Sequence, residues 1–161
     1  MTDQPGSPVL VWFRDDLRLS DHPALHAAAN SGASLVCVYV LDEDSSSRRR
    51  PLGDASRWWL AQSLRSLQAS LARRGQALVL RKGPSPRVIT GLAQDIQASA
   101  VHWIESDIPG QASVEQQVRT GLEKIGVSAN SFPSDLLVRP ASLRNKDGRG
   151  LRVFTPFWKR V

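Results

Sequence analysis

The stretch VLVWFRDDLRLSDH, residues 9–22, begins with five apolar residues and then changes abruptly to charged ones. Arg14, Asp15, Asp16 and Arg18 follow the apolar run, with only Leu17 among them. A short run that is apolar throughout is typical of a strand buried on both faces, as in a parallel sheet. The stretch therefore predicts a central strand whose carboxyl end opens directly onto charged side chains.

Apolar runs and helical patterns alternate along the rest of the chain. Strands are expected at residues 8–13, 35–41, 77–80, 100–104 and 127–132. Helices are expected between them: three begin at the capping residues Asp21, Asp54 and Ser85, and the fourth carries Val114, Val118, Leu122 and Ile125 on one face. Gly32, Gly75 and Gly126 are expected to end helices. This alternation predicts an α/β fold, a five-stranded doubly wound parallel sheet, Rossmann-like, in three α/β/α layers.

The composition is that of a globular protein. The chain has 161 residues, of which 41% are hydrophobic and 22% charged, so it can bury a core of ordinary size. The net charge of +6 permits contact with nucleic-acid phosphates but does not require it. No apolar run approaches the roughly 20 residues of a membrane span. The polar N-terminus and the single cysteine, Cys37, which is expected in the core, favour a cytoplasmic monomer.

The alternating pattern breaks after residue 132. Residues 133–150 are rich in Pro, Ser, Asn, Asp and Gly, and the aromatic segment FTPFW follows at 154–158. Large aromatic residues this close to a terminus have no later element to pack against. We therefore expect Phe157 and Trp158 to be exposed, and the chain to be cut where another domain begins.

Charged and polar residues follow three of the predicted strands. Arg14 and Asp15 follow the first, Asp42 and Glu43 the second, and Glu105, Ser106 and Asp107 the fourth. Ligands of open parallel sheets bind beyond the carboxyl ends of the strands, near the point where strand order reverses. Asp16 and Arg18 are expected to form an ion pair or to cap the turn, whereas Arg14 and Asp15 suit either a ligand contact or a structural role.

Tryptophan and histidine residues are assigned by their place in the pattern. Trp12 and Trp103 are expected in the core. Trp58 and Trp59 are adjacent on a helix, so one of them can face the core and the other a partner domain or a ring-shaped ligand. His22 and His26 are expected to be a solvated pair.

Several chemistries find no support in the sequence. It contains neither a GxxxxGK[ST] phosphate loop nor a GxGxxG motif after the first strand, which argues against an unrelated nucleotide-binding domain. No Cys/His spacing indicates a metal, and no serine lies in a nucleophile-elbow context. We expect no catalytic centre within this segment.

Three motifs carry a resemblance to a known family. VWFRDDLRLSDHPAL at 11–25 closely resembles the opening motif of the DNA photolyase/cryptochrome family, WFRxDLRLxDNxAL. VFTPFWKR at 153–160 is similar to the family's FTPFW segment, and PLGDASRWWLAQSL at 51–64 is similar to a helix of the class III cyclobutane-dimer photolyases. The resemblance covers nearly the whole chain.

The resemblance implies a domain organisation and a function. Residues 1–132 would be an α/β domain that holds a light-harvesting antenna pigment, and residues 133–161 would begin the linker to an absent C-terminal helical domain that binds FAD. In a deoxyribodipyrimidine photo-lyase, light energy passes from the pigment to reduced flavin, which donates an electron to a pyrimidine dimer flipped out of damaged DNA. This segment alone would not be catalytic. The alternative is the N-terminal domain of a cryptochrome-type blue-light photoreceptor.

The resemblance also implies a pigment site at the carboxyl edge of the sheet. The similarity around Trp58 and Trp59 to class III photolyases favours methenyltetrahydrofolate. The alternatives are a deazaflavin and an empty pocket. Gly110 and Gln111 replace an Asn-Glu pair of folate-binding relatives, which counts against the folate. Ser106 and Ile108 replace acidic residues of deazaflavin-binding relatives, which counts against the deazaflavin. The expected cofactor-binding residues are Phe13, Arg14, Asp15, Asp42, Leu52, Ser106, Asp107, Gly110 and Gln111.

Overall fold

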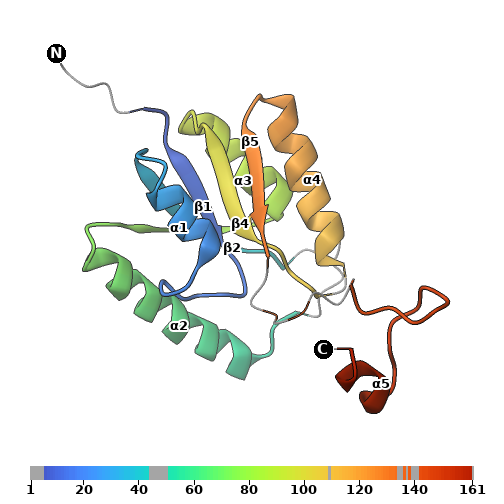
Figure 1. Cartoon of the computed structure of the whole chain (residues 1–161). Coiled ribbons are helices and arrows are strands. Elements are labelled where there is room, and N and C mark those ends of the chain that lie inside the picture. Colours follow the sequence, from blue (N-terminus) through green and yellow to red (C-terminus); the bar gives the residue numbers. More distant parts are fainter. Residues whose placement is uncertain are drawn as a thin grey trace.

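Five parallel strands form one sheet in the order β3-β2-β1-β4-β5 (Figure 1). The computed structural model describes residues 6–43, 51–108, 110–133, 136, 138 and 142–160. The strands are β1 (Val9–Phe13), β2 (Leu35–Leu41), β3 (Leu78–Lys82), β4 (Ala100–Ile104) and β5 (Ser128–Phe132). The helices are α1 (Pro23–Ala29), α2 (Asp54–Ala72), α3 (Ser85–Asp95), α4 (Gln111–Lys124) and α5 (Phe154–Trp158). The predicted doubly wound parallel sheet is confirmed.

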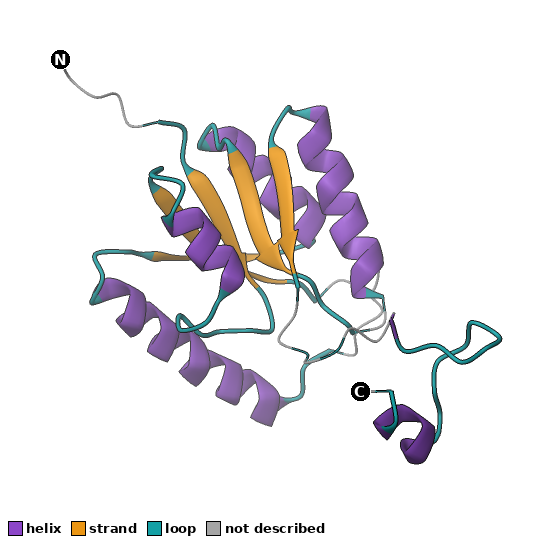
Figure 2. Ribbon diagram, viewed as in Figure 1, coloured by secondary structure: helices purple, strands orange, loops and turns teal. Residues whose placement is uncertain are grey.

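Helices cover both faces of the sheet, which gives the three predicted layers (Figure 2). On one face Ile89 of α3 and Val118 and Leu122 of α4 pack with side chains of β1, β2 and β4. On the other face Ala28 of α1 and Leu67 and Leu71 of α2 complete a second cluster. The sheet is thus buried on both sides, as continuous apolar strands require.

The two central strands are fully buried along their length. Every residue of β1 and β4 is buried, and the rings of Trp12 and Trp103 meet at 6.1 Å between centroids. Cys37 of β2 is also buried, and burial raises the pKa of its thiol to about 11. The predicted core positions of Trp12, Trp103 and Cys37 are confirmed.

The two outer strands are more polar than the central ones. β5 reads SANSF, and β3 ends in Arg81 and Lys82, which pair with Val40 and Leu41 of β2. The predicted end of the third strand at residue 80 is therefore two residues too early. An edge strand has one side open to water, so it accommodates charged residues that an apolar-run criterion rejects.

The predicted helix starts are each displaced by one residue. The cap residue of α1 is His22, because Pro23 occupies the first helical position; the cap residues of α2 and α3 are Gly53 and Pro84. The His22 ring accepts a hydrogen bond from the Leu25 amide at 3.1 Å and is only 3% exposed. The expected solvated pair of His22 and His26 is therefore wrong, since His22 is a buried cap.

Two helix ends agree with the sequence pattern. Gly75 and Gly126 follow α2 and α4 with φ of 73° and 71°, in the left-handed region that glycine adopts without strain.

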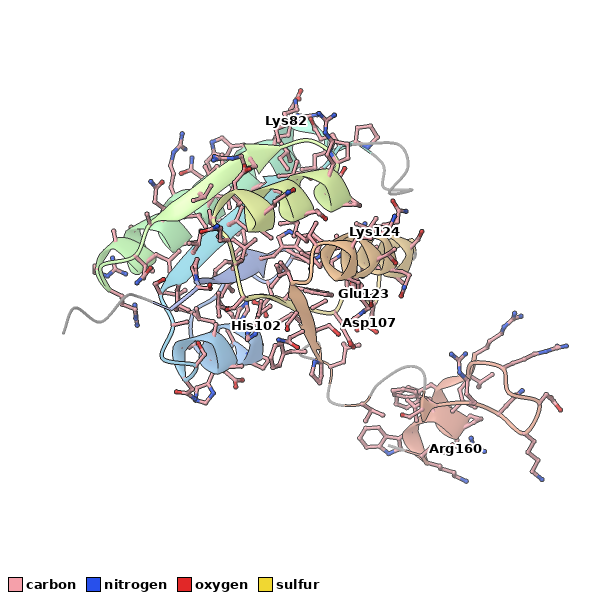
Figure 3. The ribbon with its side chains drawn as sticks, turned by 90° about the horizontal axis from the view of Figure 1, so that it is seen from above. Lys82, His102, Asp107, Glu123, Lys124 and Arg160 are labelled. Carbon is pink, nitrogen blue, oxygen red and sulfur yellow. The ribbon has the colours of Figure 1, made fainter. Side chains whose placement is uncertain are left out.

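Two histidines are held in their neutral form by burial, which lowers the pKa of both. His22 lies against Phe13, with ring centroids 5.0 Å apart. His102 lies between β4 and α1 (Figure 3), where its Nδ1 is 3.3 Å from the carbonyl oxygen of Ala24 and its Nε2 is 3.0 Å from the Asn130 amide nitrogen. Protonation of His22 would also remove the lone pair that caps α1.

We expect the chain to lose stability as the pH falls below the ordinary histidine pKa of 6.5. Below that pH the unfolded chain binds more protons than the folded one, so the free energy of unfolding decreases. Thermal unfolding between about pH 7.5 and about pH 5 measures this slope. The substitution His22→Asn retains a capping side chain and should reduce the slope, whereas His26→Asn on the exposed side of α1 should preserve it. An equal slope in wild type and His22→Asn would contradict this assignment.

Several large apolar side chains remain exposed. Trp58 and Trp59 on α2 are 62% and 69% exposed, so the expectation that one of them faces the core is wrong. In the C-terminal segment, Phe157 and Trp158 are 38% and 66% exposed, as predicted, and α5 stands apart from the sheet (Figure 1). None of the described helices has the length and apolarity that crossing a membrane requires.

Candidate functional site

The carboxyl ends of β1, β2 and β4 lie side by side at one edge of the sheet. β1 pairs with β2 on one side and β4 on the other, so the chain reverses its winding direction between β1 and β4. This is the topological switch point at which open α/β sheets bind ligands. The residues that follow these three strands are therefore brought to one place, as the sequence predicts.

Arg14 ties the end of β1 to α4. Its guanidinium donates to the Glu115 carboxylate, to Gln111 Oε1 at 2.6 Å and to the Ile104 carbonyl at 3.4 Å. The same group lies 4.7 Å from the centroid of the Trp12 ring. The Arg14 side chain is 7% exposed and Gln111 is 5% exposed. Arg14 and Gln111 thus meet at the predicted edge, but their polar groups bind each other.

Asp42 and Glu43 at the end of β2 also bind protein groups. Asp42 Oδ2 accepts a hydrogen bond from the Ser85 amide at 2.8 Å, which fixes the start of α3. Glu43 forms ion pairs with Arg57 at 2.5 Å and Lys82 at 3.1 Å. The hydrogen bond from Lys82, together with the charge of Arg57, lowers the pKa of the Glu43 carboxyl. Lys82 lies across the sheet from Asp107 (Figure 3).

The loop after β4 lies against the end of β1. The Ser106 hydroxyl is 3.4 Å from Asp15 Oδ2, and the Ser106 amide donates to Glu115 at 2.9 Å. Asp16 and Arg18 form the expected ion pair at 3.1 Å. This loop therefore places Ser106 directly beside Asp15.

Three adjacent hollows, which we call together the carboxyl-edge groove, surround Arg14 and Asp15. Their volumes are about 70, 410 and 830 Å³, and Arg14 and Asp15 line all three. The other predicted site residues that line the groove are Asp42, Leu52, Ser106, Asp107 and Gln111. Most of the predicted set is thus gathered around one groove.

Two predicted residues lie outside the groove's lining. Phe13 is fully buried and packs in the cluster beneath α1 and α2. Gly110 is the cap residue of α4, where its φ of 88° suits glycine. Both residues contribute to the fold around the groove: Phe13 packs in the core, and Gly110 lies at the start of α4.

Aromatic side chains complete the groove. Tyr39 lines the smallest and the largest hollow, and Trp59 lines the largest. The prediction that one of the two adjacent tryptophans faces a ligand pointed towards Trp59, whereas Tyr39 was missed. The position of Tyr39 near the end of its strand could have indicated this role. Tyr39 pairs with Phe13 at the end of β1, so it lies next to the carboxyl edge.

The groove combines aromatic and aliphatic walls with carboxylates. Such walls favour a flat ligand, and the Asp15 carboxylate can accept hydrogen bonds from N–H groups at its rim. The described residues contain no cluster of three or more His, Cys, Asp or Glu side chains that could hold a metal ion. The chemistry suits a planar heteroaromatic molecule better than a metal.

Comparison with known proteins now gives the family. The family model described as DNA photolyase matches residues 9–161. The chain belongs to the DNA photolyase family. The resemblance predicted from its motifs is confirmed.

Relatives of this photolyase-family chain include both photolyases and cryptochromes. It is 38% identical over 155 residues to a deoxyribodipyrimidine photo-lyase of Agrobacterium fabrum, covering 96% of this chain and 32% of the relative. It is 31% identical over 156 residues to cryptochrome-1 of Arabidopsis thaliana, covering 96% of this chain and 23% of the relative.

A solved structure shares the fold at high similarity. The crystal structure of a bacterial class III photolyase from Agrobacterium tumefaciens matches with a TM-score of 0.85 and 38% identity, covering 96% of this chain and 31% of that one. The chain spans about a third of the length of the photolyases it matches.

Proposed function

We propose that residues 1–132 are the antenna domain of a deoxyribodipyrimidine photo-lyase. The carboxyl-edge groove carries this proposal, because it lies at the switch point of the sheet in a member of the DNA photolyase family. Residues 133–161 would begin the linker to a helical FAD-binding domain, and the whole protein would act on damaged DNA. The antenna segment itself performs no bond chemistry.

The proposed pigment is methenyltetrahydrofolate. Its flat ring system suits the walls formed by Tyr39, Leu52 and Trp59, and its ring N–H groups suit the Asp15 carboxylate. Ser106 and Asp107 would add polar contacts from the loop after β4. Arg14 and Gln111 would position this rim rather than touch the pigment, since they bind each other. When bound, the pigment supplies light absorption and passes the energy on to flavin.

A substitution of Leu52 tests the pigment site. Leu52 is 36% exposed and lines two of the three hollows, so Leu52→Trp should fill the groove and weaken folate binding by roughly tenfold or more. Titration of the 161-residue chain with methenyltetrahydrofolate, followed by absorption and equilibrium dialysis, measures the affinity. The matched control is Leu80→Trp on β3, where the leucine is 49% exposed and lies outside the groove's lining.

The outcomes separate the alternatives. Binding of a deazaflavin in place of the folate, with the same loss in Leu52→Trp, would support the antenna function and change the pigment. If neither pigment binds the wild-type chain, or if both tryptophan variants bind the folate like wild type, the proposal is wrong.

The second candidate is the N-terminal domain of a cryptochrome-type photoreceptor. The 31% identity to cryptochrome-1 of Arabidopsis thaliana, across 96% of this chain, favours it. Light-dependent repair of pyrimidine dimers by the whole protein would support the photolyase proposal, and its absence under reducing conditions would favour the photoreceptor.

A further inference from the structure

A second cavity lies between α1 and α2, over the first residues of β2. Helix α1 packs on β1, β4 and β5, whereas α2 packs on β3, which leaves part of β2 between the two helices. We call this space, of about 700 Å³, the α1–α2 cavity. It shares no lining residue with the carboxyl-edge groove. Its size is within the range of small-molecule sites.

The sequence explains why the space is not filled. Helix α1 has only seven residues, and Ala29, which lines the cavity, ends it. The short alanine side chain at this position does not reach across β2, so α1 and α2 do not close over the strand. The apolar lining is Leu19, Pro23, Leu25, Ala29, Leu35, Cys37 and Leu71.

The ring of His22 lines the same cavity. Because His22 Nδ1 accepts from the Leu25 amide, the neutral ring carries its hydrogen on Nε2. Within the described part of the chain, Nε2 has no hydrogen-bond partner, although His22 is only 3% exposed. Nε2 is not one of the fully enclosed side-chain atoms that lack a partner, so it reaches the open space of the cavity, where it can donate to an acceptor of a bound molecule.

The rim of the cavity carries a permanent cation. Arg74 lines the cavity, and its guanidinium donates to the Ser70 carbonyl at 3.1 Å, which holds it near the end of α2. His26 and Gln76 add further polar groups, and Asp21 contributes the single carboxylate of the lining. An arginine above an apolar space is the arrangement that selects an apolar body with one anionic group.

We propose that the α1–α2 cavity binds a small aromatic carboxylate. The aromatic body lies against the leucines and Cys37, the carboxylate pairs with Arg74, and His22 Nε2 donates to an acceptor of the ligand. This site is separate from the pigment groove and does not depend on which pigment binds there.

Naphthoate and the uncharged naphthamide are suitable probes. Calorimetric titration of the 161-residue chain should show naphthoate binding, and naphthamide should bind about tenfold more weakly because it cannot form the charged pair. Backbone amide NMR shifts should concentrate at Leu25, Ala29 and Leu71.

Two pairs of variants test the location. Arg74→Gln should weaken naphthoate binding about tenfold and leave naphthamide unchanged, whereas Arg73→Gln at the neighbouring arginine, outside the lining, should change neither. Ala29→Trp at the rim of the cavity should obstruct it and abolish binding of both probes, whereas Ala69→Trp, at an exposed position of α2 outside the lining, should not. Thermal unfolding confirms that each variant is folded.

The proposal is overturned if naphthoate fails to bind the wild-type chain, if Ala29→Trp binds it like wild type, or if the NMR shifts lie at Asp15 and Ser106 instead. The α1–α2 cavity shares no lining residue with the carboxyl-edge groove, so Ala29→Trp leaves that groove intact. Failure of naphthoate to bind would therefore leave the pigment proposal unaffected. Folate binding that is lost in Leu52→Trp but retained in Ala29→Trp would show the two sites to be independent.

Discussion

Replacing Arg14 by methionine is expected to lower the free energy of unfolding by about 3–5 kcal/mol, the usual cost of removing one partner of a buried ion pair. The Arg14 and Glu115 side chains are 7% and 13% exposed, so the Glu115 carboxylate would remain in a poorly solvated place without its cation. Gln111 and the Ile104 carbonyl would lose a donor as well. Methionine retains apolar contact with Trp12, so the effect reports mainly the lost charge. Urea unfolding followed by circular dichroism measures it.

The ion pair of Arg18 with Asp16 provides the control. These side chains are 35% and 23% exposed, and Arg18→Met should cost only about 0–1 kcal/mol. The double variant Arg14→Met/Glu115→Met should recover part of the loss, because no charge is then left unpaired. The recovery is partial, since Glu115 also accepts from the Ser106 amide. Equal losses in Arg14→Met and Arg18→Met would refute the structural role of Arg14.

Gly121→Ala is expected to destabilise the chain by about 1–3 kcal/mol through overpacking between α3 and α4. A Cβ atom at Gly121 would lie 2.5 Å from Thr90 Oγ1 and 3.5 Å from both Thr90 Cβ and Cγ2. The helices must separate or Thr90 must change its rotamer to admit the methyl group. Thermal and urea unfolding measure the loss.

A second glycine and a compensating variant separate overpacking from helix propensity. Gly91 is also helical, and a Cβ there meets nothing within 4 Å, so Gly91→Ala should stabilise the chain by up to about 1 kcal/mol. Thr90→Ala removes the opposing hydroxyl and methyl groups, so Gly121→Ala should be tolerated in the Thr90→Ala background. Additive losses in the double variant would contradict the proposed contact.

The strands were predictable because most of them lie in the middle of the sheet. Residues 9–13 are apolar throughout and residues 100–104 are apolar except for His102, a composition that burial on both faces favours. The third strand was predicted less well, because Arg81 and Lys82 belong to an edge that water reaches. The predicted helix starts were displaced for a different reason. At α1, for example, several residues next to Pro23 can occupy the cap position. Periodicity alone does not say which side chain accepts the amide hydrogen bond there.

The candidate site was predictable as a location but not as a set of contacts. Parallel topology brings the strand ends together, so Arg14, Asp15, Ser106 and Asp107 could be assigned to one edge. The partners of Arg14 lie about a hundred positions along the chain, and their pairing depends on how α4 packs. A sequence shows which groups can pair, whereas the packed helix decides that Gln111 holds Arg14.

The polar character of β3 and β5 has a consequence beyond the single molecule. Each outermost ribbon presents main-chain groups that could recruit a neighbour's sheet, and such recruitment leads to fibrous or amorphous assemblies. Lysine and arginine at one flank, and serine and asparagine at the other, make that association unfavourable. The core can therefore be continuous and rich in branched side chains without making the protein prone to aggregation.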